Sequence, residues 1–214
     1  MRLHDYAASG NCYKVRLLLA LFEEPYERVA VDIFAGDTLT PEFGRLNPVR
    51  ETPVLELDTG ETITQSNAIL WYLAEGTGFL PDTRLDRAQI VQWLSFEQER
   101  IMSGVGGTRF RRLTGRAALD PAADAARFAT GLAALEVLDG HLEGRSFVVG
   151  ERCSIADLSL FGYTHVANDA GFELASFPSV TGWLARIQAL PGFVADLVPY
   201  PENALPGRGR SIYD

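Results

Sequence analysis

With 214 residues, 47% of them hydrophobic, the chain is long enough for one large domain or two small ones with a packed core. Its formal net charge of −9 and its scattered arginines argue against a nucleic-acid partner, because phosphates are bound by clustered cations. No apolar run reaches the roughly 20 residues of a membrane helix and none follows Met1, so we expect a cytoplasmic protein without a membrane partner.

The first eighty residues predict alternating strands and helices. Alternating or continuous apolar runs indicate the strands, and apolar faces that recur every three to four residues indicate the helices. Thr40 is a favourable helix cap, and Pro41 suits the first position of a helix. The predicted order is βαβαββα, with strands at 2–6, 26–31, 54–57 and 61–64, apolar helices over 15–22 and 66–74, and a short helix that begins at 41.

The rest of the chain predicts helices alone. Residues 76–83 hold the glycines and the proline of a linker, which separates an α/β domain at 1–77 from an all-helical domain at 84–214. The tail over 199–214 has no helical period and is expected to lie over the surface. The helices are expected around residues 90–96, 122–142, 155–166 and 180–190.

Two local patterns stand out in the helical half. Gly104, Gly106 and Gly107 are expected to interrupt the first long helix, because glycine is unfavourable inside a helix. Ser154 and Asp157 have the spacing of a capping box, in which each side chain bonds to a backbone N–H of the other residue. This second pattern predicts a structural role.

Thr52 and Pro53 stand directly before the short strand at 54–57. Proline cannot donate to a sheet ladder, so a proline here needs a structural reason. One reason is a cis Thr52–Pro53 bond that turns the backbone of Thr52 outward to pair with an extended ligand, and the alternative is a trans proline that opens an edge strand. Gln65 and Ser66 begin the next helix, where N–H groups favour an anion, so the pattern favours the cis bond and a tripeptide-sized site.

Five short motifs occur along the chain in a fixed order. They are Ser9-Gly10-Asn11, Asn47-Pro48 leading to Thr52-Pro53, Gln65-Ser66, Ser154-Ile155-Ala156-Asp157, and the run from Trp183 to Phe193. In this order they resemble a cytosolic glutathione S-transferase over residues 1 to about 198. The resemblance implies an N-terminal thioredoxin-like domain that binds glutathione as a co-substrate, a C-terminal helical bundle that shapes the pocket for a small electrophile, and a homodimer.

The resemblance also implies which residues hold the first two parts of glutathione. Ser66 would offer its hydroxyl and backbone N–H groups to the γ-glutamyl carboxylate, and Gln65 would add its amide. Thr52, followed by a cis Pro53, would exchange backbone hydrogen bonds with the cysteine of the ligand.

The glycine carboxylate of glutathione needs a cation or a strong donor. Arg50 is one candidate by resemblance, although Glu51 stands where relatives often carry a basic residue. Thr38 is the other, because it aligns with a glutamine that contacts glutathione in zeta-class enzymes. Arg16 faces the same region and is expected to form an ion pair inside the domain.

Three residues of one loop are candidates for stabilising the glutathione thiolate. By resemblance to the serine-using classes, Ser9 would donate its hydroxyl to the sulfur, and Asn11 would donate its amide as in some bacterial disulfide-reducing relatives. Both also suit plain N-capping of the first helix. Cys12 lies near the catalytic cysteine of the beta and omega classes, but it falls past the usual position and has no Cys-x-x-Cys partner. Cys153 is expected to be buried and inert, and the two cysteines indicate neither a disulfide scaffold nor a metal site.

The electrophile pocket is expected around the glycine-rich helix, with contributions from the tail. The residues proposed to line it are Ile101, Met102, Val105, Arg109 and Tyr213. Arg109 and two neighbouring arginines form either a solvated helix face or a receptor for an acidic substrate, and a solvated face is favoured.

Four functions follow from these patterns. The favoured one is a transferase that conjugates glutathione to a small hydrophobic electrophile, with Ser9 as the thiolate stabiliser. Asn11 points to glutathione-dependent reduction of a disulfide or peroxide as the alternative. A zeta-like cis–trans isomerase ranks lower because the full Ser-Ser-Cys run is missing, and a non-catalytic binding protein of the same fold is the fourth.

Overall fold

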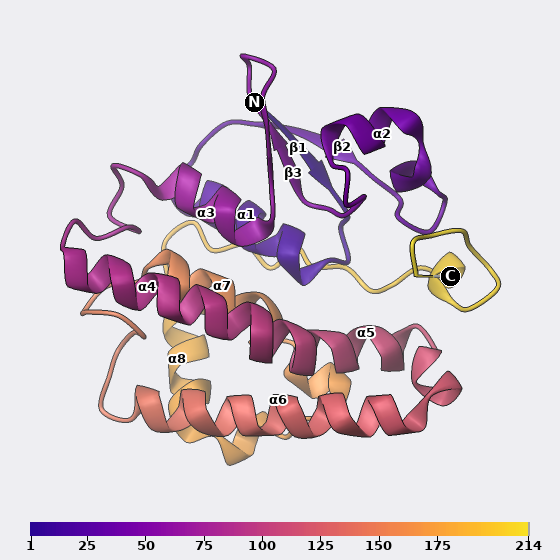
Figure 1. Cartoon of the computed structure of the whole chain (residues 1–214). Coiled ribbons are helices and arrows are strands. Elements are labelled where there is room, and N and C mark those ends of the chain that lie inside the picture. Colours follow the sequence, from indigo (N-terminus) through magenta and orange to yellow (C-terminus); the bar gives the residue numbers. More distant parts are fainter. Residues whose placement is uncertain (214) are drawn as a thin grey trace.

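The structure is a computed structural model that describes residues 1–213, and it places a small sheet with its helices above a layer of longer helices (Figure 1). The N-terminal half has the predicted βαβαββα order. Its elements are β1 (Arg2–Asp5), α1 (Gly10–Leu21), β2 (Glu27–Ala30), α2 (Pro41–Leu46), β3 (Val54–Glu56), β4 (Thr62–Thr64) and α3 (Ser66–Ala74).

The second half is helical, as predicted. Its main helices are α4 (Arg84–Phe96), the π-helical segment η2 (Glu97–Gly106), α5 (Gly107–Leu113), α6 (Pro121–Leu142), α7 (Ile155–Thr164) and α8 (Pro178–Gln188). Short 3₁₀ turns occupy η1 (Asp37–Leu39), η3 (Arg116–Leu119), η4 (Ala167–Ala170), η5 (Leu174–Ser176) and η6 (Glu202–Ala204). The predicted fold class is confirmed: a thioredoxin-like α/β unit joined to a helical bundle. The domain boundary at 77–84 stays a prediction.

The sheet has the strand order β2-β1-β3-β4, with β1 parallel to β2 and antiparallel to β3. Leu3 of β1 is opposite Arg28 on one side and Leu55 on the other. Helices α1 and α3 pack on one face, and α2 covers the other through Phe43, which packs with Val54. The loops at the start of α1 and before β3 thereby come to the same end of the sheet.

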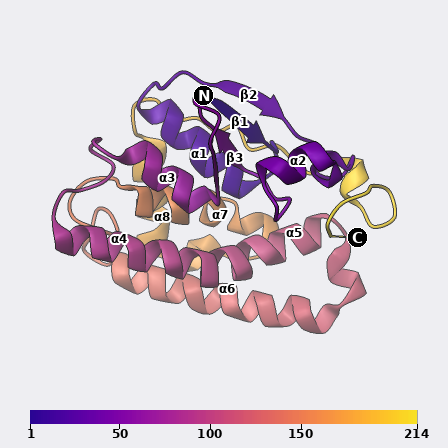
Figure 2. The same cartoon turned by 45° about the horizontal axis from the view of Figure 1, so that its top comes forward.

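Helix α1 is buried on both sides, which explains why its sequence is apolar almost all round. Val15 and Leu19 pack against the sheet, whereas Leu17 and Leu18 belong to a core that also holds Leu158 of α7. Figure 2 shows α1 between the sheet and the helical layer. The two halves of the chain therefore share one apolar core, and this core fixes the start of α1 relative to the bundle.

The glycines at 104–107 do not break the helix, contrary to the prediction. The backbone remains helical through η2 and continues into α5. Gly104 faces the long helix α6 so closely that an added Cβ would lie 2.5 Å from the backbone nitrogen of Gly131. Glycine is therefore required here for close helix packing, and this packing outweighs its poor helix propensity.

The predicted capping box is present at the start of α7. The Ser154 N–H and hydroxyl both donate to the Asp157 carboxylate, at 2.9 Å each. The same carboxylate accepts from the Val148 N–H and from Trp183 Nε1, also at 2.9 Å. Asp157 thus ties three segments of the bundle together while fully buried.

The C-terminal tail does more than lie over the surface. It returns to the N-terminal half beside α2, as both views of the fold show (Figures 1 and 2). The Arg210 N–H donates to the Phe34 carbonyl at 2.7 Å, and Asn203 donates to Asp32 at 2.8 Å. Within residues 1–213, no helix is both long enough and apolar enough to cross a bilayer.

Candidate functional site

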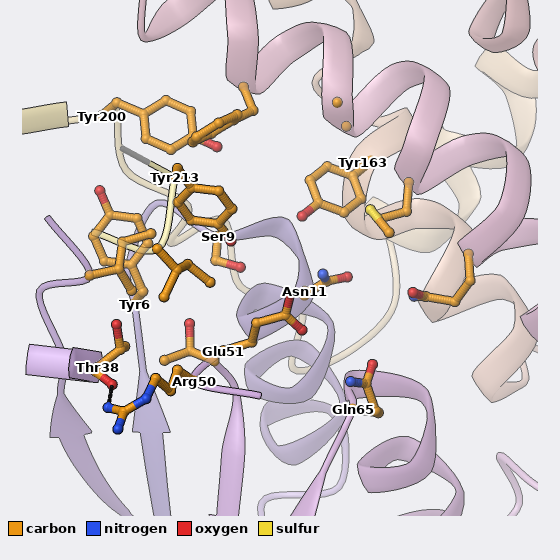
Figure 3. Close-up of a pocket in the computed structure, with 18 residues that line it drawn as sticks. Tyr6, Ser9, Asn11, Thr38, Arg50, Glu51, Gln65, Tyr163, Tyr200 and Tyr213 are labelled. Atoms are coloured by element: carbon orange, nitrogen blue, oxygen red, sulfur yellow. Dashed lines mark hydrogen bonds between the residues drawn. The ribbon is translucent and has the colours of Figure 1, made fainter. Parts of the chain in front are cut away.

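A cavity of about 270 Å³ lies between the two halves of the chain, where the loops of the sheet meet η2, α5, α7 and the tail. Figure 3 shows Ser9, Thr38 and Arg50 on the side of the sheet, and Tyr163, Tyr200 and Tyr213 across the space from them. The cavity is lined by Tyr6, Ser9, Asn11, Ile33, Thr38, Arg50, Glu51, Thr52, Gln65, Gln98, Met102, Gly106, Gly107, Phe110, Tyr163, Tyr200, Ile212 and Tyr213.

Ser9 ends the loop after β1 and caps α1. Its Oγ accepts from the Cys12 N–H at 3.3 Å, so the N-capping role is present. A hydroxyl both accepts and donates, and the Ser9 O–H proton remains available to a ligand in the cavity. Capping and ligand binding are therefore compatible in this residue.

Asn11 lies one residue inside α1 and also lines the cavity. Its Oδ1 accepts from Lys14 Nζ at 2.9 Å and from the Ser66 hydroxyl at 3.4 Å. Its Nδ2 has no protein partner within the described chain. The amide therefore offers two N–H donors at the positive end of α1.

The Thr52–Pro53 bond is cis, as predicted. Thr52 lines the cavity, and its backbone N–H and carbonyl make no backbone hydrogen bond within residues 1–213. An extended ligand can therefore pair with both groups. Two neighbours have left-handed φ values that non-glycine residues adopt uncommonly, 62° at Arg50 and 70° at Gln65, and both line the same cavity.

Arg50 and Thr38 meet at one end of the cavity. Arg50 Nη1 donates to the Thr38 carbonyl at 2.7 Å and to the Thr40 carbonyl at 2.9 Å, and Figure 3 marks the first of these bonds. Thr38 is only 1% exposed, and its Oγ1 is buried without a partner among the described residues. An unpaired buried hydroxyl is costly, so this atom is a candidate for ligand binding.

Pro53 and Ser66 do not line the cavity, although the sequence predicts them in the site. Pro53 is buried beneath Thr52 at the start of β3. Ser66 is 3% exposed at the first turn of α3, and it contacts the cavity wall through its hydroxyl bond to Asn11. Gln65, by contrast, is exposed and lines the opening.

The prediction for the electrophile pocket was wrong for three of its five residues. Met102 and Tyr213 line the cavity, but Ile101 and Val105 are fully buried in the bundle core. Arg109 is also buried and pairs with Asp169 at 3.2 Å. The apolar stripe of η2 faces the core because Gly104 presses the same side of that helix against α6.

The arginine cluster is a solvated helix face only in part, because Arg109 is buried, Arg111 is half-buried and Arg112 is exposed. Arg111 donates to the Arg116 carbonyl, and Arg112 pairs with Asp124 at 3.0 Å and donates to the Ala170 carbonyl at 2.6 Å. These guanidinium groups tie α5 to neighbouring turns. Arg16 forms the expected internal ion pairs, with Asp5 and with Asp196 at 2.8 Å.

A reactive Cys12 is disfavoured by its surroundings. Its side chain is fully buried, with the sulfur 3.4 Å from the Tyr6 backbone nitrogen, and burial together with the Asp5 charge raises the pKa of the thiol to about 12. Cys153 is buried as predicted, and burial raises the pKa of its thiol as well. Thiolate chemistry by either cysteine would need a lowered pKa.

Sequence patterns missed seven residues of the cavity wall, four of which are aromatic. The missed residues are Tyr6, Ile33, Gln98, Phe110, Tyr163, Tyr200 and Ile212. Tyr163 is inserted between two glycines, since a Cβ on Gly10 would lie 2.5 Å and a Cβ on Gly106 3.0 Å from its ring. Gly10 and Gly106 were the sequence features that could have indicated a large side chain packed between them. The tail residues offered no such feature, because an irregular segment has no periodicity from which the direction of a side chain could be predicted.

The donors in the cavity fit glutathione. They comprise the free backbone of Thr52, the hydroxyls of Ser9 and Thr38, and the amides of Asn11 and Gln65. Within the described chain, no group of three or more histidine, cysteine or acidic side chains could hold a metal ion.

Two curated relatives align with nearly the whole chain. A maleylacetoacetate isomerase from Rhizobium meliloti is 34% identical, over 95% of this chain and 97% of its own length. The disulfide-bond oxidoreductase YfcG from Escherichia coli is 30% identical, over 87% and 89%.

Solved structures agree in fold. A possible glutathione S-transferase from Rhodopseudomonas palustris has a TM-score of 0.88 and 42% identity, and the alignment covers 93% of this chain and 98% of that one. A Burkholderia graminis glutathione transferase with two glutathione molecules bound per subunit has a TM-score of 0.78 and 29% identity, covering 89% and 84%. The family models for the N-terminal and C-terminal glutathione S-transferase domains match residues 8–75 and 118–191. The chain therefore belongs to the glutathione S-transferase family.

Proposed function

We propose that this protein binds glutathione in the cavity and transfers its thiolate to a small hydrophobic electrophile. The observation that carries the proposal is the pair of uncommitted donors, the Ser9 hydroxyl and the Asn11 amide, at the N-terminus of α1 beside the free backbone of Thr52. Donors of this kind stabilise a thiolate and lower the pKa of the thiol.

The rest of glutathione has a place on either side of Thr52. The γ-glutamyl carboxylate would bind at the start of α3 to Gln65 and Ser66, where the helix dipole favours an anion. The glycine carboxylate would lie toward Arg50 and the unpaired Thr38 Oγ1.

The electrophile would occupy the half of the cavity formed by Met102, Phe110, Tyr163, Tyr200 and Tyr213. In a substitution on an aryl halide, the sulfur lone pair forms the new C–S bond, and the halide leaves with the electrons of the broken bond. The role of the chain in this step is to hold the sulfur deprotonated and to exclude water from the apolar wall.

Reduction of a disulfide or a peroxide is the second candidate, favoured by the free Asn11 amide and by the likeness to a disulfide-bond oxidoreductase. Isomerisation of a maleyl dicarboxylate has the likeness to an isomerase in its favour, but Arg109, the cation suggested for such a substrate, pairs with Asp169 and is not among the residues that line the cavity. A non-catalytic binding protein would keep the same glutathione site.

The proposal also includes the assembly and the location of the protein: a homodimer in the cytoplasm, with a role in detoxification.

The test is a parallel assay of an aryl halide, a model disulfide, an organic peroxide and a maleyl dicarboxylate with glutathione. We expect aryl-halide conjugation to be the fastest of the four and to depend on Ser9. If aryl-halide conjugation is no faster than the uncatalysed reaction and one of the other substrates is turned over rapidly, the activity on that substrate replaces the transferase as the proposed function. Absence of glutathione binding by calorimetry would contradict the whole proposal.

Cys12 is expected to stay unmodified by oxidised glutathione in the native protein. Its burial and raised pKa leave almost no thiolate at neutral pH. Intact-protein mass spectrometry after incubation at pH 7.5 checks this, with the same incubation in guanidinium chloride as the control in which both cysteines react. A native mixed disulfide that disappears in Cys12→Ser would restore the cysteine mechanism.

A further inference from the structure

Lys14 is a fully buried cation that the proposed chemistry leaves unexplained. It lies on α1 one turn after Asn11, and its side chain is 0% exposed. Burying an ammonium group is expensive unless it is paired and hydrogen-bonded. A lysine retained at such a place therefore calls for a specific role.

The Lys14 ammonium is held by groups from both halves of the chain. Nζ lies 2.7 Å from the carboxylate of Glu97 in η2, which is also 0% exposed, and 5.5 Å from the centre of the Tyr163 ring. Burial lowers the pKa of Lys14 and the Glu97 charge opposes this shift. Cys12, in its thiol form, and the Tyr163 phenol, whose pKa burial raises, are the other titratable groups beside it.

Glu97 is itself fixed by three further donors. Asn67 Nδ2 and the Ser159 hydroxyl lie 3.1 Å from Oε2, and Gln98 Nε2 lies 2.8 Å from the same atom. These contacts come from α3, α7 and η2. These contacts fix the position of the Glu97 carboxylate, and with it the position of the Lys14 ammonium group beside α1.

The remaining contact of Lys14 is the Oδ1 atom of Asn11, at 2.9 Å. An ammonium group only donates, so the atom of the Asn11 carboxamide that faces it must be the oxygen. The Ser66 hydroxyl reinforces this orientation from the start of α3. Figure 3 shows the nitrogen of Asn11 on the side of Ser9 and its oxygen on the opposite side.

We propose that Lys14 is a positioning residue that keeps the Asn11 carboxamide turned with its Nδ2 toward the glutathione sulfur. Without this ammonium group, rotation about the last side-chain bond would present the carbonyl oxygen to the sulfur and replace a donor by a repelling dipole. The inference rests on the proposed function, since it assumes that the sulfur lies beside Asn11. Glu97 has the supporting role of counter-charge.

The test uses Lys14→Met together with Glu97→Gln, so that neither charge is left buried alone. Three quantities are measured: the pKa of bound glutathione from thiolate absorbance, the affinity for S-methylglutathione, and the urea midpoint. We expect the double variant to raise the thiol pKa by about one pH unit, similar to Asn11→Ala, with affinity changed less than about threefold. In an Asn11→Ala background the same pair of changes should not move the pKa further, because interacting residues are not additive.

Ser159→Ala is the matched control, since it removes a hydroxyl that lies 2.6 Å from Asn67 Oδ1 and 3.1 Å from Glu97 Oε2 and leaves the contact between Lys14 and Asn11. It should lower the urea midpoint without moving the thiol pKa. A folded double variant with a wild-type thiol pKa would overturn the role of Lys14. So would a double variant that raises the thiol pKa as much in the Asn11→Ala background as it does in the wild-type background. A wild-type protein that does not lower the thiol pKa at all would instead contradict the proposed function.

Asn11→Asp provides a second measurement that keeps Lys14 in place. One carboxylate oxygen would pair with the ammonium group and the other would face the sulfur, so the thiol pKa should rise by more than in Asn11→Ala. A rise no larger than that of Asn11→Ala would show that the amide does not point at the sulfur, and would overturn the inference even where the double variant does not fold.

Discussion

Ser9→Ala will raise the pKa of protein-bound glutathione by about one pH unit, while the affinity for glutathione stays within about tenfold of the wild-type value. The Ser9 hydroxyl donates to the sulfur only when the sulfur is a thiolate acceptor, so its loss acts on ionisation more than on binding. Absorbance of the thiolate, titrated with saturating glutathione, measures the shift directly.

Ser9→Thr is the control for this experiment, because threonine keeps the hydroxyl and also caps a helix. It should keep the thiol pKa near the wild-type value. Ser9→Ala also removes the bond from the Cys12 N–H and should cost about 1 kcal/mol of folding stability, which is measured separately by urea unfolding. A thiolate titration that is the same in Ser9→Ala and wild type would remove Ser9 from the mechanism and leave Asn11 as the donor.

Asp157→Ala will lower the free energy of unfolding by about 4 kcal/mol, the largest stability effect that we expect for a single polar side chain. Its carboxylate accepts from Ser154, Val148 and Trp183, all in a region without solvent. Each buried donor left without an acceptor costs about 1–3 kcal/mol. Burial raises the pKa of this carboxyl group, and the four hydrogen bonds oppose that rise.

Asp120→Ala offers a comparison, since Asp120 caps α6 through the Ala123 N–H at an exposed position. That change should cost about 1 kcal/mol. Both variants are measured by urea denaturation at one fixed protein concentration, because association would shift the midpoint. A loss in Asp157→Ala no greater than in Asp120→Ala would mean that the bundle does not depend on this carboxylate.

Local chemistry was predictable wherever short-range rules apply. The capping box needs only Ser154 and Asp157 at the right spacing, and the cis bond was favoured by Pro53 before a strand together with Gln65 and Ser66 at the start of the next helix. Both were confirmed. The register of the glycine-rich helix was not predictable, because the close approach of Gly104 to α6 decides which stripe is buried. Ile101 and Val105 therefore face the core, and Met102 and Gly106 face the cavity.

The sequence by itself determined the α/β-then-helical order, because that order depends on periodicity, and its short motifs indicated Ser9, Asn11 and Thr52, which line the cavity. Only the tertiary structure decided the direction of the Asn11 amide, through Lys14 and a glutamate 83 residues further along the chain. It also brought the tail across the cavity. Contacts between distant segments leave no local pattern, so the aromatic wall of the cavity appears only after folding.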